Sequence, residues 1–318
     1  MNSIHTNEHW MQNTAVVWLG AMLCCVLWGS AFPCIKIGYR LLEIDSADTA
    51  TQILFAGCRF ALAGVLTILI GSVLARQMIY PRKQSIGRVL WLSMLQTVLQ
   101  YLFFYVGLAH TSGVKASIIE AVNVFAAILV ASLIFHQERL TRSKMLGCAV
   151  GFLGVILVNL TGMNLQFQFQ GEGFIFLSTI AYAFSSVFMK RYSVDDNPVM
   201  LSGYQFLLGG IIMIAAGWLM GGRLHTATVS GILLLLYLSG VSAVAYSIWG
   251  MLLKYNPVSR VTVFGFMNPV CGVILSTILL HEKNQAGGLI TMVSLVLVCI
   301  GIYIVNRCGN GQSDRRGR

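Results

Sequence analysis

Charged residues are scarce in this chain of 318 residues. Only 10% of them are Asp, Glu, Lys or Arg, and 57% are hydrophobic, which gives a mean hydropathy of +0.77. Soluble proteins carry about 25% charged residues. The composition therefore excludes the pair of soluble domains that the length would allow, and it favours a protein that lies within a lipid bilayer.

Motifs for catalysis and metal binding are also missing. The sequence has no CxxC pair, and its six histidines are scattered. A zinc-binding helix beginning at His281-Glu282 would need a second histidine at position 285, where Gln285 stands. No glycine-rich phosphate loop follows a strand pattern. We expect no metal, no cofactor, no enzymatic reaction and no use of ATP by this chain.

Long apolar runs fill most of the sequence instead. Runs of about 20 residues are long enough to cross a hydrocarbon core of about 30 Å. Ten such runs lie at approximately 15–39, 50–74, 88–110, 114–135, 141–161, 172–192, 198–221, 228–254, 258–280 and 285–306. Within lipid the backbone has no water to bond, so each run is expected to be a helix. The predicted fold is an all-α membrane protein with ten transmembrane helices, whose cysteines are small core residues rather than disulfide partners.

The basic residues behind the net charge of +10 are unevenly distributed. If the N-terminus is cytoplasmic, the inner loops carry fifteen Lys and Arg residues, and the outer loops carry only four, namely Arg40, Lys115, Arg223 and Lys283. Such a bias places both termini in the cytoplasm, with residues 1–14 and 307–318 as tails. The membrane topology thus explains the positive net charge. We expect the lipid bilayer as a partner, and no nucleic acid.

The chain contains an internal repeat. Residues 101–159 are similar to residues 246–306, and the helices that precede these segments match as well. Matched positions include Tyr101 with Tyr246, Leu108 with Leu253, Asn123 with Asn268, Trp28 with Tyr182, Lys36 with Lys190, and 57–64 with 203–210. The repeats, 15–161 and 172–306, hold five helices each. An odd number of helices makes the second repeat enter the membrane from the opposite side, so the two repeats are predicted to be inverted.

Polar and aromatic side chains gather near the middle of the predicted helices. Gln96 and Gln100 are four residues apart and so share one helical face. The candidate substrate-binding residues are Trp28, Gln96, Gln100, Asn123, Tyr182, Tyr246, Trp249 and Asn268. Hydrogen bonds between helices, each worth about 0.6–2 kcal/mol, would explain the polar side chains by packing alone. For the set as a whole we prefer a site shared between the repeats.

Three charged residues, Lys36, Arg59 and Glu120, lie clearly inside apolar runs. An unpaired charge at a helix centre costs at least about 2.5–3.5 kcal/mol. Arg59 and Glu120 have nearly the same predicted depth, so we expect them to pair. The set is either a structural ion pair or a charge and coupling site for a polar solute, and its surplus cation would suit an anionic group.

Prolines and glycines predict local features of the helices. Pro33 is expected to kink the first helix, and Pro269 denies a hydrogen bond to the carbonyl of Gly265. Gly147 and Gly151 form a G-x-x-x-G pattern, which predicts a close helix contact, either within the bundle or in a homodimer through glycine-containing helices.

In their order along the chain, these features resemble the EamA-type members of the drug/metabolite transporter superfamily. The resemblance covers residues 15–306 and includes the duplicated five-helix plan. It depends on Trp28-Gly-Ser-Ala-Phe with Lys36, on Arg59-Phe60, on Glu138 and Glu282, and on Gly147, Gly154 and Gly301. The proline that the family usually has in the fourth helix of each repeat is present as Pro269, but its counterpart is Val124.

The resemblance implies a ten-helix carrier that has a central cavity and works by alternating access. Members of the family typically export amino acids, other small metabolites or drugs from bacteria, and relatives move nucleotide sugars or sugar phosphates. We expect a secondary exporter of small metabolites such as amino acids in the bacterial inner membrane. The alternatives are an importer or exchanger of phosphorylated or nucleotide-linked sugars, and a membrane scaffold or sensor that transports nothing.

Overall fold

The structure is a computed structural model, and it describes residues 10–45, 47–111, 113–158, 167–224, 228–280 and 288–313. Within these ranges all regular structure is helical, without a strand. The elements are α2 (Thr14–Leu41), α3 (Thr49–Ala75), α4 (Lys83–Leu92), η1 (Ser93–Leu99), α5 (Gln100–Ala109), α6 (Gly113–Leu129), η2 (Val130–Ile134), α7 (Arg142–Val158), η4 (Phe169–Gly173), α8 (Phe174–Tyr192), α9 (Pro198–Leu219), α10 (Val229–Tyr255), α11 (Val258–Thr262), η5 (Val263–Phe266), α12 (Met267–Leu280) and α13 (Gly288–Ser313).

Six helical stretches in the described part of the chain are long and apolar enough to cross a bilayer. They are Thr14–Leu41, Thr49–Ala75, Lys83–Leu108, Phe169–Tyr192, Pro198–Leu219 and Val229–Tyr255. Two shorter apolar helices are Ile119–Ile134 and Met292–Arg307. The all-helical class and the multi-pass character follow from these stretches, whereas the full number of ten crossings stays a prediction.

Side-chain caps explain where several of these helices begin. Asn13 accepts a hydrogen bond from the backbone N–H of Ala15 at 2.9 Å before α2. Asp48, Asn197 and Thr228 accept equivalent bonds at the starts of α3, α9 and α10. Such caps satisfy N–H groups that have no partner within the helix. Polar residues at the ends of the apolar runs therefore set the helix boundaries.

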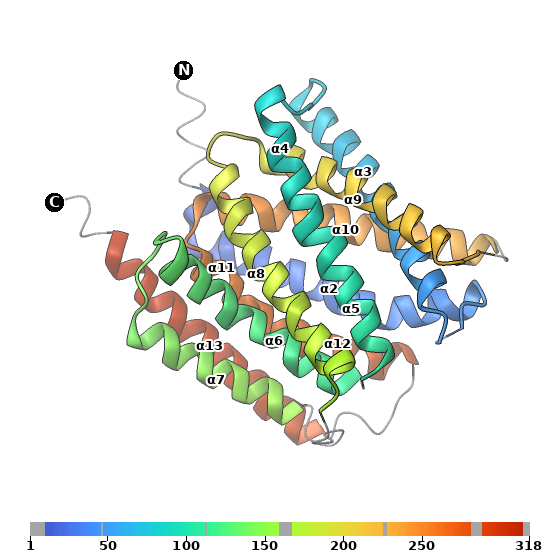
Figure 1. Cartoon of the computed structure of the whole chain (residues 1–318). Coiled ribbons are helices and arrows are strands. Elements are labelled where there is room, and N and C mark those ends of the chain that lie inside the picture. Colours follow the sequence, from blue (N-terminus) through green and yellow to red (C-terminus); the bar gives the residue numbers. More distant parts are fainter. Residues whose placement is uncertain are drawn as a thin grey trace.

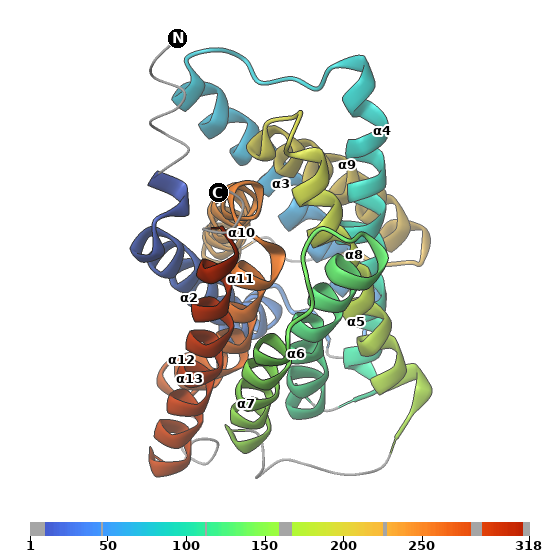
Figure 2. The ribbon, with the colours of Figure 1, turned by 90° about the vertical axis from the view of Figure 1, so that its left-hand side faces the viewer.

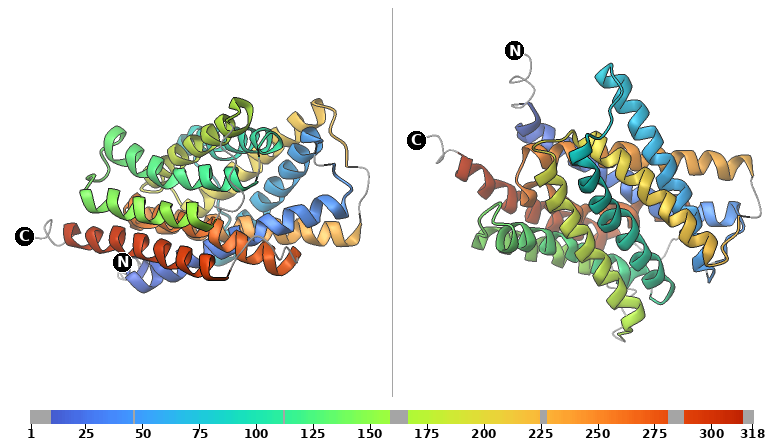
Figure 3. Two further views of the ribbon diagram at one scale, coloured as in Figure 1. Left: turned by 90° about the horizontal axis from the view of Figure 1, so that it is seen from below. Right: turned by 45° about the horizontal axis from the view of Figure 1, so that its top comes forward.

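The helices form two layers with a helix pair at each edge (Figure 1). In one layer α2 packs against α10 and α12, and in the other α8 packs against α5 and α6. Figure 3, in its left panel, shows these layers one above the other. The pair α3 and α9 lies at one edge and the pair α7 and α13 at the other (Figure 2). In the predicted repeat, each layer takes its helices from both halves of the sequence.

Glycines allow α3 and α9 to approach to backbone contact. A Cβ added to Gly57 would lie 3.0 Å from the carbonyl oxygen of Gly210, and one added to Gly64 would lie 2.7 Å from that of Gly203. Rising numbers in α3 meet falling numbers in α9, so the two helices are antiparallel. The repeat matches Gly57 with Gly203 and Gly64 with Gly210. The two contacts are therefore equivalent by the repeat.

The pair α7 and α13 is arranged in the same way. A Cβ added to Gly147 would lie 2.8 Å from the carbonyl oxygen of Gly301, and one added to Gly154 would lie 2.8 Å from that of Ser294. The glycine face of α7 is thus filled within one chain. A homodimer through glycine-containing helices stays a prediction.

The helices around Pro33 and Pro269 differ from each other in the structure. Pro33 lies inside α2, which continues to Leu41 as one helix. The segment before Pro269 has a tighter turn, the 3₁₀ element η5, because the proline cannot donate to the preceding turn. The counterpart of Pro269 is Val124, which lies within the uninterrupted helix α6. The fourth helices of the two repeats therefore differ in shape because their residues differ.

A buried polar network joins several helices at one end of the molecule. Glu138 accepts hydrogen bonds from the Lys144 ammonium at 3.0 Å, from the Ser259 hydroxyl at 2.6 Å and from the Ser259 N–H at 3.0 Å. Lys190 donates to the carbonyl oxygen of Leu253 at 3.0 Å and to that of Asn256. We call these residues the Glu138 network. It connects the segment before α7 with the end of α8, the end of α10 and the start of α11.

Candidate functional site

A cavity of about 230 Å³ lies between the two layers. Residues of α2, α3, α5, α6, α8, α10, η5 and α12 line it. Most of the residues predicted from the sequence are among them: Trp28, Lys36, Arg59, Gln100, Glu120, Asn123, Tyr182, Tyr246 and Asn268. The lining positions lie in the C-terminal half of α2, along the whole of α5, and mainly in the N-terminal halves of α6 and α8. The cavity and the Glu138 network therefore lie toward opposite ends of the helices.

Aromatic rings form much of the cavity wall. The ring of Trp28 lies edge-on to Tyr246 at a centroid distance of 5.0 Å. The hydroxyls of Tyr101 and Tyr246, which the repeat makes equivalent, are 3.1 Å apart. Phe60 stacks on its own repeat equivalent, Phe206, at 5.4 Å. Residues that match by the repeat thus meet in pairs beside the cavity.

Several lining aromatic residues were not among the sequence candidates. They are Phe32, Tyr39, Tyr101, Phe104 and Tyr105. Tyr101 could have been found, because the repeat matches it with the candidate Tyr246. Nothing in the sequence marks the other four as cavity residues, because aromatic side chains also occur on helix surfaces that pack inside a protein or face lipid.

Two predicted binding residues lie outside the cavity lining. Gln96 is buried and accepts a hydrogen bond from the Gln205 amide at 2.5 Å. Trp249 is buried behind Trp28, with ring centroids 4.9 Å apart. Gln96 therefore joins η1 to α9, and Trp249 supports Trp28 from behind.

Arg59 is held by α10 and not by Glu120. Its side chain is buried, and it donates to the Leu238 carbonyl at 3.3 Å and to the Ser242 hydroxyl at 3.0 Å. Its guanidinium also lies over the ring of Phe60, 5.2 Å from the centroid. The predicted pairing of Arg59 with Glu120 is wrong. Helix α10 packs against α3 and provides the acceptors for the guanidinium, so Arg59 is bonded without an ion pair to Glu120.

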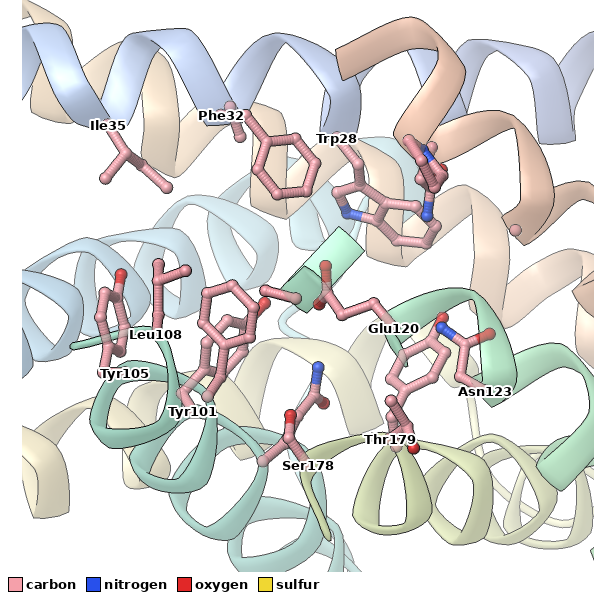
Figure 4. A pocket seen from close by; sticks show the side chains of 18 of the residues that line it. Trp28, Phe32, Ile35, Tyr101, Tyr105, Leu108, Glu120, Asn123, Ser178 and Thr179 are labelled. Carbon is pink, nitrogen blue, oxygen red and sulfur yellow. The ribbon is translucent and has the colours of Figure 1, made fainter. Parts of the chain in front are cut away.

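Glu120 extends from α6 into the cavity. Figure 4 shows its carboxylate, together with the side chain of Asn123, opposite Trp28 and Phe32 of α2. Ser178 and Thr179 of α8 close the cavity from below in this view. Among the residues that the structure describes, none donates a hydrogen bond to the Glu120 carboxylate, and none forms an ion pair with it. A carboxyl group without a partner among the described residues is therefore presented to the space where a solute would lie.

Three further polar atoms in the lining are buried without a hydrogen-bond partner in the described part of the chain. They are the indole nitrogen of Trp28, Oε1 of Gln100 and Oδ1 of Asn268. Folded proteins pair the great majority of their buried polar atoms, so such atoms usually serve water or a ligand. Lys36, in contrast, is exposed where it lines the cavity.

The arrangement suits reversible binding of a small solute. It combines ring faces, amide groups and one carboxylate in a volume of about 230 Å³. Within the described ranges, no three His, Cys, Asp or Glu residues lie together as ligands for a metal ion.

Comparison with known proteins assigns the family. The family model described as "EamA-like transporter family" matches residues 15–160 and again residues 169–307. The chain belongs to the EamA-like transporter family. It is therefore a member of a family of membrane transporters.

Individual relatives match along nearly their whole length. An uncharacterized transporter of Archaeoglobus fulgidus is 29% identical over 295 residues, covering 91% of this chain and 98% of that protein. A probable amino-acid metabolite efflux pump of Salmonella typhimurium is 27% identical over 298 residues, covering 89% of this chain and 92% of the pump. The uncharacterized inner membrane transporter YedA of Escherichia coli K12 is 26% identical over 288 residues, covering 88% of this chain and 89% of YedA.

A solved structure shares the fold. One crystal structure superimposes with a TM-score of 0.72 and 14% sequence identity, and the match covers 93% of this chain and 99% of the other. At this level of identity the likeness concerns the fold alone.

Proposed function

We propose that this protein is a secondary transporter that works by alternating access and exports small metabolites such as amino acids. It would be a multi-pass protein of the bacterial inner membrane with both termini in the cytoplasm. The observation that carries the proposal is the cavity between the two layers, which is lined by aromatic rings and by polar atoms without partners in the described part of the chain. Membership of a transporter family supports it.

The contacts between equivalent residues support two inverted five-helix repeats, over residues 15–161 and 172–306. Phe60 contacts Tyr101 at 4.3 Å, and their repeat equivalents Phe206 and Tyr246 contact each other at 4.8 Å. Antiparallel pairing of α3 with α9 and of α7 with α13 agrees with the same relation. In inverted-repeat carriers the substrate site lies near the membrane midplane where the repeats meet. The position of the cavity between helices of both halves of the sequence supports such a site.

The distribution of Lys and Arg residues along the sequence indicates which side of the membrane the cavity faces. With the N-terminus in the cytoplasm, the Glu138 network lies on the inner side and the cavity lies toward the outer side. The structure would then represent the outward-facing state of the cycle. Transport of this kind needs neither cofactor nor covalent chemistry, so the partners are a small-molecule substrate and the lipid bilayer.

Counterflow in proteoliposomes tests the proposal. Vesicles preloaded with unlabelled amino acids should accumulate the labelled amino acid when they contain the protein, because a carrier exchanges solute in both directions. Trp28→Ala should abolish this uptake, since Trp28 forms part of the cavity wall. Trp218→Ala is the matched control, because Trp218 is exposed outside the cavity.

Other outcomes of the same assay would refute parts of the proposal. Counterflow of sugar phosphates or nucleotide sugars, but not of amino acids, would keep the carrier and replace its substrate. If folded protein moves none of these solutes, a scaffold or sensor without transport becomes the better explanation.

A further inference from the structure

The cavity lining contains one carboxyl group, that of Glu120, beside the cationic side chains of Arg59 and Lys36. Glu120 belongs to α6, the helix Gly113–Leu129, and its side chain enters the cavity (Figure 4). No described residue donates a hydrogen bond to its carboxylate or lies at ion-pair distance from it. Charged groups at such depth are rare and usually mark the path of a substrate or an ion.

Two cationic side chains, those of Arg59 and Lys36, also line the cavity, but neither is paired with Glu120. Both donors that Arg59 is seen to use are directed at α10, at the Leu238 carbonyl and the Ser242 hydroxyl. Lys36 is exposed, and it follows Trp28 by eight residues, which is about 12 Å along α2 at 1.5 Å per residue. Neither of them forms an ion pair with Glu120. Among the described residues no cation neutralises Glu120, so this role is left to a proton or to a charged group of the solute.

The surroundings of Glu120 suit an ammonium group in particular. Gln100 Oε1 and Asn268 Oδ1 are buried acceptors in the same cavity, without donors in the described part of the chain. An alkylammonium group has three donors and no acceptor. The rings of Trp28, Tyr101 and Tyr246 line the same space, and ring faces attract cations that come within about 6 Å. An anionic group would instead meet Glu120 as a like charge.

We propose that the cavity recognises its substrate through a positively charged amino group, which pairs with Glu120 inside the aromatic wall. The inference rests on the proposed transport function and names its substrate class: small primary amines and amino acids whose remaining part is apolar. The carboxylate of an amino acid is not the group that the site selects. An amine without a carboxylate should therefore bind as well as the corresponding amino acid.

A matched series of solutes tests this inference. Phenethylamine, phenylalanine, N-acetylphenylalanine and 3-phenylpropionate share a phenyl group and differ in charge. We would measure the thermal unfolding of the purified full chain against each of them, because a solute that binds only the folded state raises Tm. Phenethylamine and phenylalanine should raise Tm in a dose-dependent way, and the two solutes without a charged amino group should not.

Substitutions of Glu120 test whether its carboxylate is the group that binds the amine. Glu120→Gln keeps the shape and removes the charge, so the affinity for phenethylamine should fall at least about tenfold, the loss expected for one charge-assisted contact. Glu120→Asp keeps the charge and should retain more affinity than Glu120→Gln. Glu43→Gln makes the same replacement at an exposed glutamate outside the cavity and should bind like the wild type. The Tm of each variant without solute shows that it is folded.

The inference is overturned if 3-phenylpropionate or N-acetylphenylalanine binds as tightly as phenethylamine, if Glu120→Gln retains the wild-type affinity, or if no member of the series binds. Counterflow of the same series separates this failure from failure of the proposed function. Movement of the anionic members alone refutes the amine site and keeps the carrier. Movement of no solute in this series or in the amino-acid and sugar panels refutes both.

Discussion

Arg59 is buried within α3, and yet its charge is surrounded by neutral acceptors. The Leu238 carbonyl and the Ser242 hydroxyl accept its hydrogen bonds, and the Ser239 hydroxyl donates to its backbone carbonyl at 3.1 Å. Hydropathy predicts the depth of Arg59 and of Glu120 from the sequence, but depth does not specify which neighbouring helix each side chain faces. The direction of Arg59 depends on the packing of α10 against α3, which no local pattern encodes.

Removing one of these acceptors should destabilise the protein. Ser242→Ala leaves a buried guanidinium donor unpaired, so the free energy of unfolding should fall by about 1–3 kcal/mol. Ser247→Ala is the control on the same helix, because its hydroxyl donates to the carbonyl of Ala243 within α10. Equilibrium unfolding in mixed detergent would compare them, and equal losses in the two variants would contradict the assignment.

Gln96 and Gln100 illustrate the limit of reading a helical face from spacing. They are four residues apart, which in an α-helix would place them together. Gln96, however, belongs to the π-helical element η1, whose turns are wider, and Gln100 begins α5. Gln96 bonds to Gln205 of α9, whereas Gln100 reaches the cavity. The sequence thus predicts the polar pair but not the change of helix type between its members.

At the scale of helices, the contact between α3 and α9 depends on residues without side chains. A Cβ added to Gly210 would lie 2.2 Å from the backbone nitrogen of Ala61 and 2.7 Å from its Cα. Backbone atoms cannot move aside as a flexible side chain can, so the two helices would have to separate. Small residues permit such close packing between membrane helices.

Gly210→Ala should therefore lower the free energy of unfolding by about 1–3 kcal/mol, as overpacking of a tight interior does. Gly240→Ala provides the control, since a Cβ at Gly240 in α10 meets nothing within 4 Å. At Gly240 the replacement should not lower the free energy of unfolding. It should raise it by about 0.5–1 kcal/mol, because glycine is unfavourable within a helix. A Gly210→Ala variant as stable as Gly240→Ala would show that the helices are not held at this distance.

The Glu138 network links elements through a buried ion pair. The carboxylate of Glu138 is 3.0 Å from the Lys144 ammonium, and the side chains are 7% and 3% exposed. Glu138→Gln would leave the lysine charge buried without its counter-ion, so stability should fall by about 3–5 kcal/mol. Asp195→Asn, at a residue whose side chain is 62% exposed and 2.9 Å from Arg88, should cost at most about 1 kcal/mol. Thermal unfolding of the two variants checks the difference, and similar losses would contradict it.

For the whole molecule, hydropathy and the repeat predicted the helical class and the equivalent positions, because both depend on patterns along the chain. The layers combine helices from different halves, and the cavity depends on which faces meet, so neither could be predicted from one stretch of sequence. The difference between Pro269 and Val124, in contrast, is visible in the sequence itself. The segment before Pro269 has a 3₁₀ turn, whereas α6, with valine at the matched position, continues without one.

The repeat also relates the two ends of the molecule. At the Glu138 network, Lys190 of α8 donates to the Leu253 carbonyl of α10. The equivalent residues, Lys36 and Leu108, both line the cavity at the other end. If the repeats exchange conformations during transport, Lys190 holds α8 to α10 when the cavity is open to the outer side. In the opposite state Lys36 would then hold α2 to α5 through the Leu108 carbonyl.

Replacing either lysine should thus shift the equilibrium between the two states in opposite directions. If the bonds of Lys190 are broken in the opposite state, Lys190→Met weakens only the state seen here, so deuterium uptake in residues 256–262 should rise as that end opens. Lys36→Met would weaken the other state and should leave uptake there unchanged or lower. Hydrogen exchange with mass spectrometry on protein in lipid nanodiscs measures both. Equal changes in the two variants would show that the two lysines stabilise the fold in general, and that neither distinguishes the two states.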